Sequence, residues 1–150
     1  MTLQEILTAD CTLCSVALAS KKRILEKIAA TAAVKAPNLD QSQLLASLME
    51  REKMGSTGIG NGIAIPHGRL KTLDKALAVF VTTEKPIAFD AIDDRAVDIF
   101  IAIFVPENAC DQHLSTLQSI AKLFSDKHTG KIIRKCSDAN ELFNVINQLG

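Results

Sequence analysis

Two segments of this sequence are almost continuously apolar, and they limit the possible folds more than any other feature. Residues 97–105 are apolar except for Asp98, and residues 76–81 are apolar throughout. Runs of this kind, rich in β-branched side chains, are typical of strands that are covered on both faces of a sheet. Helices must therefore supply the covering layers.

Helix signals occur on both sides of these strands. Ser20 can cap a first helix, and Asp40 opens a second one with a capping box. A third helix is expected over residues 111–124, with Leu114 on its apolar stripe, and Asp138 opens a last one. A shorter basic helix is expected around residues 131–135.

The chain has 150 residues, of which 47% are apolar. A chain of this length buries roughly 70% of its unfolded surface in one compact domain. A short strand is also expected over residues 62–66, before the two long ones. The sequence therefore predicts an α/β fold in which one domain, residues 1–150, forms a mixed β-sheet flanked by helices on both faces.

The charge balance excludes several classes of partner. Lysine and arginine together number 17, aspartate and glutamate also 17, and the formal net charge is zero. The broad positive field that draws proteins to nucleic acids or anionic membranes is missing. The longest apolar stretch, residues 99–105, is far shorter than the ~20 residues that span a bilayer, and the first residues do not resemble a signal peptide. We expect a cytoplasmic protein that binds no nucleic acid and does not insert into membranes.

The four cysteines include one Cys-x-x-Cys pair, Cys11 and Cys14, together with Cys110 and Cys136. No second pair or nearby histidine completes a zinc site, and a redox Cys-x-x-Cys normally opens a helix after a strand. We expect reduced thiols, with a metal or disulfide role as the less favoured alternative.

Five of the seven glycines lie between Gly55 and Gly68, and this window ends in Ile-Pro-His67-Gly68. Clustered glycines let backbone N–H groups converge on an anion. The window matches none of three known patterns. It has no P-loop lysine, it follows a helix instead of the strand that a dinucleotide fingerprint requires, and it lacks the nucleophile elbow.

His67 is the strongest candidate for chemistry in this window. A neutral imidazole is nucleophilic near pH 7 and can accept a phosphoryl group. The alternative is that His67 only bonds a turn carbonyl while the glycines shape a tight connection. The residues alone leave these two interpretations equal.

Three residues upstream or inside the window could bind phosphate. Helical spacing places Arg51 on the buried stripe of its helix, aimed at the glycines, although it could equally be a favourable charge at a helix C-terminus. Ser56 and Thr57 add hydroxyl donors, but both residue types are also common in ordinary turns.

Two further histidines complete the candidates. His113 lies in the first turn of the helix over 111–124, where free amides bind anions, so it could face His67 across a phosphate. A half-exposed histidine without a role is an equal alternative. His128 lies in a polar segment and is assigned to the surface.

The string from Gly55 to Gly68, preceded by Arg51-Glu-Lys-Met, resembles the phosphorylation-site signature of enzyme IIA proteins of the fructose/mannitol type, which belong to the bacterial phosphotransferase system. It is most similar to their nitrogen-regulatory branch. Residues 86–92 and 113–117 are also similar, so the resemblance covers nearly the whole chain. One departure is visible, because Ser115 stands where the family's His-Leu-His-Thr-Leu stretch has a second histidine.

The resemblance implies a role for each candidate. His67 would carry the phosphoryl group on Nε2, His113 would be the second active-site histidine, and Arg51 with Ser56 or Thr57 would line the phosphoryl pocket. The donor would be a small carrier protein phosphorylated on histidine, supplied ultimately by phosphoenolpyruvate, with no metal or cofactor required.

The family's mixed sheet flanked by helices agrees with the fold predicted above. The expected function is a regulatory phosphocarrier whose phosphorylation state controls cytosolic or membrane-associated partner proteins. Two alternatives stay open: a sugar-specific IIA component that passes phosphate to a IIB domain, and a module that binds an anion without covalent chemistry.

Overall fold

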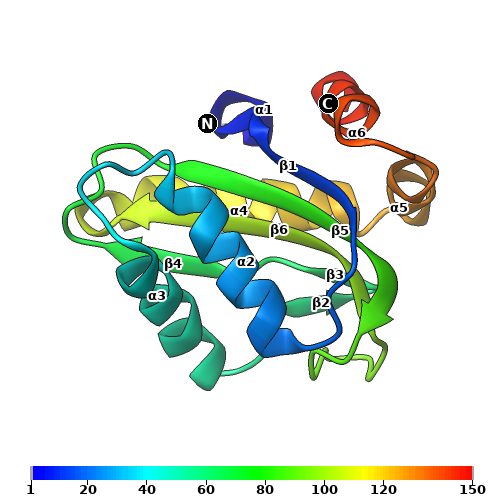
Figure 1. Ribbon diagram of the computed structural model, residues 1–150, viewed down its shortest axis with the longest axis horizontal. Coiled ribbons are helices and arrows are strands. Elements are labelled where there is room, and N and C mark those ends of the chain that lie inside the picture. The colour runs from blue at the N-terminus through cyan, green and yellow to red at the C-terminus, as the bar shows by residue number, and fades with distance from the viewer. Residues whose placement is uncertain (1, 150) are drawn as a thin grey trace.

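The computed structural model describes residues 2–149, except for the side chains of residues 109–112. Its centre is one mixed six-stranded sheet (Figure 1). The elements in chain order are α1 (Leu3–Ile6), β1 (Leu7–Val16), α2 (Lys21–Ala33), α3 (Gln41–Lys53), β2 (Gly58–Gly60), β3 (Ile63–Ala64), β4 (His67–Leu70), β5 (Leu77–Ile87), β6 (Val97–Pro106), a 3₁₀ turn (Glu107–Ala109), α4 (Cys110–Phe124), α5 (Lys127–Arg134) and α6 (Ala139–Gln148).

The two apolar segments form the centre of the sheet, as predicted. β5 and β6 pair in antiparallel fashion from Leu77 opposite Phe104 to Ile87 opposite Val97. Nine of the ten residues of β6 are buried, and Asp98 is the exception. β5 runs six residues beyond its predicted end. The prediction stopped too early because the second half of the strand, which begins at Thr82, is polar and lacks the apolar run of the first half.

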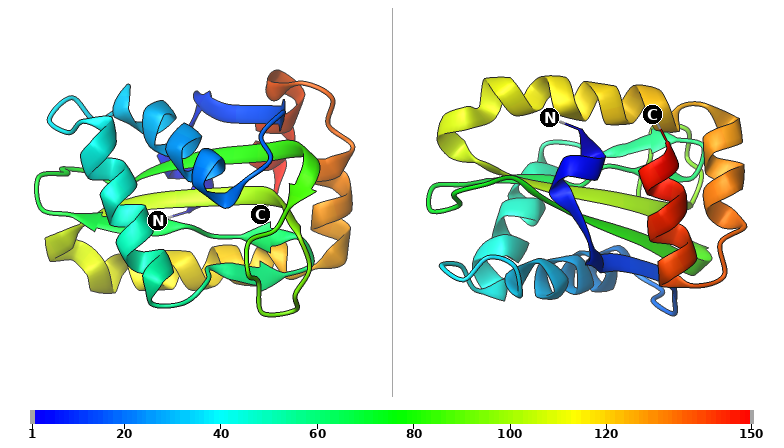
Figure 2. Two further views of the ribbon diagram at one scale, coloured as in Figure 1. Left: turned by 60° about the horizontal axis from the view of Figure 1, so that its bottom comes forward. Right: turned by 90° about the horizontal axis from the view of Figure 1, so that it is seen from above.

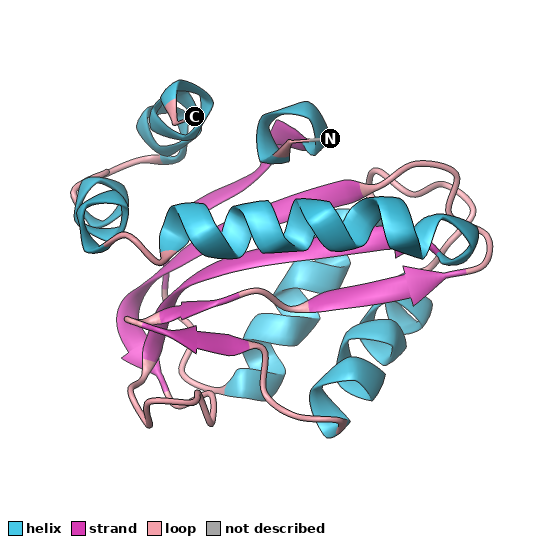
Figure 3. Ribbon diagram, turned by 180° about the vertical axis from the view of Figure 1, so that it is seen from behind, coloured by secondary structure: helices cyan, strands magenta, loops and turns pink. Residues whose placement is uncertain are grey.

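Helices cover both faces of the sheet, and this confirms the predicted fold class. α2 and α3 lie on one face and α4 lies on the other (Figures 2 and 3). Ser20 caps α2 by accepting from the Arg23 amide, and Asp40 and Gln43 form the predicted capping box of α3. α5 begins four residues earlier than predicted, because Asp126 caps it. None of the helices within residues 2–149 is long and apolar enough to cross a membrane.

Strand β1 was not predicted from the sequence. It pairs in parallel with β5 at one edge of the sheet, and its residues include threonine, serine and aspartate, which hide the strand pattern. Cys11 and Cys14 lie within this strand and not at the start of a helix. The thiols of Cys11, Cys14 and Cys136 form no disulfide, and Cys110 lies outside the described side chains.

β3 and β4 are two halves of one strand beside β6. Both pair with β6 in parallel, Ile63 with Ile99 and His67 with Ile103. Ile65 and Pro66 interrupt the pairing. The Ile65 amide points away from β6 and donates to the carbonyl of Thr57, the residue just before β2 (3.0 Å). The interruption puts His67 at the first position of β4.

Candidate functional site

A cavity of about 400 Å³ lies where α3, β4 and the start of α4 meet. Three of the five residues predicted from the sequence line it: His67, Arg51 and His113. The other lining residues are Ser47, Glu50, Met54, Gly68, Arg69, Val105, Glu107, Leu114 and Leu117.

The ring of His67 is held in one orientation. Its Nδ1 lies 3.0 Å from the Ile65 carbonyl oxygen. Because a carbonyl oxygen only accepts, Nδ1 carries the proton and Nε2 keeps a free lone pair. Burial lowers the pKa of His67 below its ordinary value of 6.5, and the positive charges of Arg51 and Arg69 lower it further. The hydrogen bond to Ile65 and the negative charge of Glu52 raise the pKa, but they only partly offset this decrease. His67 is therefore a neutral, nucleophilic imidazole at pH 7.

An NMR titration should show this lowered pKa directly. In the folded protein the ring of His67 should take up its proton only at a pH below 6.5, so the nucleophilic form persists into mildly acidic buffer. The reference is the same chain in denaturant, and His67→Ala identifies the resonance. A midpoint at or above that of the denatured chain would contradict the expectation.

Arg51 lies near the end of α3 and bonds the start of the glycine window. Its Nη1 donates to the Gly55 carbonyl at 2.8 Å, while the side chain also lines the cavity beside His67. The neighbouring Glu52 is paired with Lys21 at 3.0 Å. Arg51 therefore keeps guanidinium donors for an anion in the cavity.

His113 reaches the cavity from the first turn of α4. It is only 5% exposed, and its Nδ1 has no hydrogen-bond partner among the described residues. A buried nitrogen left unsatisfied is uncommon in folded proteins and is often found where a side chain takes part in catalysis. The alternative of a half-exposed histidine is wrong, because the side chain is buried, and a role for His113 in the site stays a prediction.

The structure does not bring the hydroxyl groups of Ser56 and Thr57 to the cavity. Ser56 Oγ donates to the Phe89 carbonyl (2.7 Å) and accepts from the Gly58 amide (3.1 Å). Thr57 is buried, and its Oγ1 donates to the Glu52 carboxylate. Both hydroxyls thus donate to protein groups that do not line the cavity.

Several of the glycines are needed for close packing or for turn geometry. A Cβ on Gly58 would lie 2.6 Å from that of Ala91, and Gly62 has φ +79° in the turn between β2 and β3. A Cβ on Gly68 would overlap Ser47 of α3. The missing side chain of Gly68 thus lets α3, which carries Arg51, approach the strand that carries His67.

Gly68→Ala should destabilise the protein by about 1–3 kcal/mol, the usual cost of adding atoms to a filled core. Its Cβ would lie 2.7 Å from Ser47 Cβ and 3.1 Å from a backbone carbon, which cannot move independently. Chemical denaturation measures the change. Gly130→Ala is the matched control, because its new Cβ would meet only the flexible end of Arg134, and alanine favours the helix. Equal stability of the two variants would contradict the close-packing argument.

The sequence predicts an apolar rim around His67 from Ile59 and Ile63, but this is wrong, because Ile63 is buried and neither residue lines the cavity. The exposed apolar residues there are others. Met54 is 78% exposed and Leu114 is 56% exposed, although Leu114 was expected on the buried stripe of its helix. The stripe is turned so that Thr116 and Ile120 are buried and Leu114 faces outward beside the cavity. Exposed apolar side chains around a reactive group suit contact with another protein.

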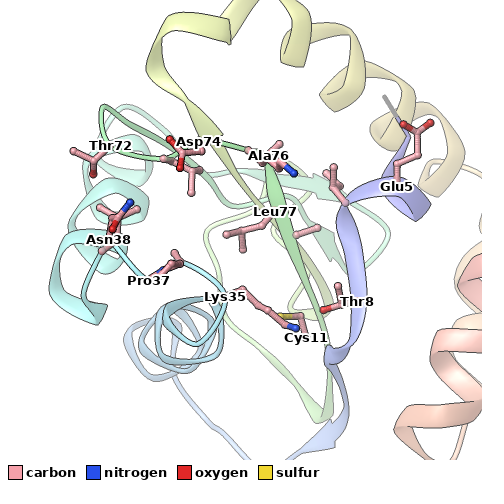
Figure 4. Close-up of a pocket in the computed structure, with 16 residues that line it drawn as sticks. Glu5, Thr8, Cys11, Lys35, Pro37, Asn38, Thr72, Asp74, Ala76 and Leu77 are labelled. Atoms are coloured by element: carbon pink, nitrogen blue, oxygen red, sulfur yellow. The ribbon is translucent and has the colours of Figure 1, made fainter.

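A second cleft, of about 360 Å³, lies between β1, the loop after α2 and the loop before β5. Figure 4 shows Thr72 and Asp74 on one side and Lys35, Thr8 and Cys11 on the other. Burial raises the pKa of the Cys11 thiol and so disfavours its thiolate. Among the described residues, this cleft therefore offers no nucleophile comparable to His67.

The chain is similar to known proteins over nearly its whole length. A nitrogen regulatory protein of Klebsiella oxytoca is 45% identical over 150 residues, 99% of this chain and 91% of that protein. One of Escherichia coli K12 is 46% identical over 146 residues, 96% of this chain and 88% of that protein.

The crystal structure of nitrogen regulatory protein IIA-Ntr from Neisseria meningitidis superimposes with a TM-score of 0.90 at 34% identity, covering 95% of this chain and 97% of that one. IIA mannitol from Escherichia coli shares the fold, with a TM-score of 0.73 at 18% identity, covering 91% and 96% of the two chains. Residues 5–149 match the family described as phosphoenolpyruvate-dependent sugar phosphotransferase system, EIIA 2. The resemblance predicted from the glycine window is confirmed, and the chain belongs to this EIIA family.

Proposed function

We propose that this protein is a regulatory phosphocarrier that accepts a phosphoryl group on Nε2 of His67 from a carrier protein phosphorylated on histidine. The bond between His67 Nδ1 and the Ile65 carbonyl carries the proposal, because it leaves Nε2 as the nucleophilic nitrogen. The lowered pKa of His67 keeps that nitrogen unprotonated at neutral pH.

The transfer is an in-line displacement. Nε2 of His67 forms a bond to phosphorus while the bond from phosphorus to the donor's imidazole breaks, and the donor ring leaves with its electron pair. The guanidinium of Arg51 stabilises the equatorial oxygens, and His113 supplies a second polar group from the other side of the cavity. The proton on Nδ1 stays on the bond to Ile65, which stabilises the positive charge that develops on the ring.

Nitrogen regulation is favoured over sugar transport by the relatives. The proteins that match nearly the whole chain at 45–46% identity are named nitrogen regulatory proteins. A fructose-specific EIIA component of Haloferax volcanii matches at 34% over 83 residues, only 55% of this chain. We place the protein in the cytoplasm, where its phosphorylation state would control partner proteins that dock on the exposed Met54 and Leu114.

The test is the intact mass of the protein after incubation with phosphoenolpyruvate, the system's first enzyme and its histidine carrier. We expect a gain of one phosphoryl group that alkali preserves and acid removes, as for phosphohistidine. A chase with a IIB domain then separates the two carrier functions, because rapid loss of the group to IIB would favour the sugar-specific alternative. No gain in mass would favour a module that binds an anion without covalent chemistry.

A further inference from the structure

Glu52 is an unusual residue for its position. It lies at the negative end of the α3 dipole, where a carboxylate is disfavoured, and its side chain is only 6% exposed. A buried carboxylate is costly unless it is paired and hydrogen-bonded. The buried carboxylate therefore needs an ion-pair partner and hydrogen-bond donors. One of these donors, described below, is connected to His67.

Lys21 holds Glu52 from the first turn of α2. Its Nζ lies 3.0 Å from Glu52 Oε1 and 4.4 Å from the centre of the buried Phe89 ring. The Lys21 side chain is 26% exposed, so this ion pair is partly shielded from water. Two helices are thus joined at the carboxylate.

Glu52 in turn holds Thr57 by three hydrogen bonds. The Thr57 amide lies 3.1 and 3.3 Å from the two carboxylate oxygens, and Thr57 Oγ1 donates to Oε2. A carboxylate that accepts several hydrogen bonds fixes both the side chain and the peptide of its donor. The Ser56–Thr57 peptide and the Thr57 side chain are therefore both held, directly before the peptide that carries the Thr57 carbonyl.

The contact continues to the nucleophile through one residue, Ile65, whose amide and carbonyl belong to two consecutive peptide groups. The Ile65 amide donates to the Thr57 carbonyl at 3.0 Å, and the Ile65 carbonyl accepts from Nδ1 of His67 at 3.0 Å. Thr57 directly precedes β2, and this bond extends the antiparallel pairing of β2 with β3 by one residue beyond Gly58 opposite Ala64. The orientation of the group that holds His67 thus depends on Thr57.

We infer that Glu52, held by Lys21, is a positioning residue for phosphoryl transfer, acting through Thr57 and the backbone of Ile65 to hold His67 with its proton on Nδ1. The inference rests on the proposed function for its catalytic consequence, because Glu52 does not line the cavity and touches no reacting atom. Without Glu52 the Ile65 carbonyl can turn, and the ring is free to place its proton on Nε2, which removes the nucleophile.

The experiment reads the tautomer of His67 in the unphosphorylated protein by long-range ¹H–¹⁵N NMR, beside the kinetics of phosphoryl uptake. Wild type should show the Nδ1–H tautomer. Glu52→Ala should populate the Nε2–H tautomer and lower the maximal uptake rate about ten- to a hundredfold, the range for a misplaced catalytic group. The donor concentration at half-maximal rate should not change. Glu84→Ala, an exposed acidic residue on β5, is the control for lost charge and should behave as wild type.

Lys21→Met covers the case in which Glu52→Ala does not fold. It keeps an unbranched apolar chain beside Phe89 but removes the cation that holds Glu52, and it should cause the same change of tautomer. A wild-type tautomer in the folded variants would overturn the inference, whatever the uptake. If His67 never accepts phosphate in wild type, the proposed function fails while the tautomer result still decides the role of Glu52.

Discussion

His67→Ala should abolish phosphoryl uptake and leave the fold intact. Among the described side chains of the cavity, this imidazole combines a lowered pKa with a ring orientation fixed by a hydrogen bond. The side chain is partly exposed, and the backbone pairing of β4 with β6 does not depend on it. We expect a full phosphoryl gain in wild type, none in the variant, and a change in unfolding free energy within about 1 kcal/mol.

His128→Ala is the matched control. His128 is exposed on α5, away from the cavity, so its loss should leave uptake unchanged. Uptake retained in His67→Ala would mean that another side chain accepts the group, and peptide mapping under alkaline conditions would identify it. Unfolding of His67→Ala alone would show that the ring is structural.

The sequence predicted those strands and helices whose apolar pattern can be recognised within a single segment of the chain. Residues 97–105 are apolar on both faces, so their burial at the centre of the sheet follows from the side chains alone. β1 has no such pattern, because an edge strand can expose polar residues such as Thr8 and Asp10 on its open side.

The site also has some features that a local sequence pattern predicts and others that it does not. Helical spacing favoured a position of Arg51 near the glycine window, whereas the residues alone left open whether His113 faces His67. Both Arg51 and His113 line the cavity beside His67. The residues left open whether the glycines bind an anion or shape a tight connection, and they did not show that Gly58 and Gly68 make close contacts with Ala91 and Ser47. These partners are distant in sequence or on another element, so no local pattern contains them.

The pairing of Lys21 with Glu52 could not be predicted either. The lysine was part of a charged run that a solvated helix turn explains, and the glutamate lies at the far end of the next helix. Only the packing of α2 against α3 brings the two charges to 3.0 Å. Long-range ion pairs of this kind depend on tertiary structure, which no spacing rule describes.

His113→Ala should slow phosphoryl transfer to His67 about 10²–10³-fold, the usual cost of removing one group that stabilises a transition state. Its effect on stability should be small, because the truncation removes a buried nitrogen that has no partner among the described residues. Removing that nitrogen is stabilising, whereas the loss of the packing contacts of the ring is destabilising, so the two effects partly cancel. The measurement is single-turnover transfer from the phosphorylated carrier, with thermal denaturation in parallel.

Thr116→Val is a matched control for His113→Ala, since Thr116 is buried one turn further along α4 and does not line the cavity. It should leave the transfer rate within a few-fold of wild type. Transfer at the wild-type rate in a folded His113→Ala would remove this histidine from the site. A rate that falls only in proportion to lost stability would make its role structural. A slow rate with unchanged stability would assign His113 to the transition state, since a residue that merely packs cannot alter one without the other.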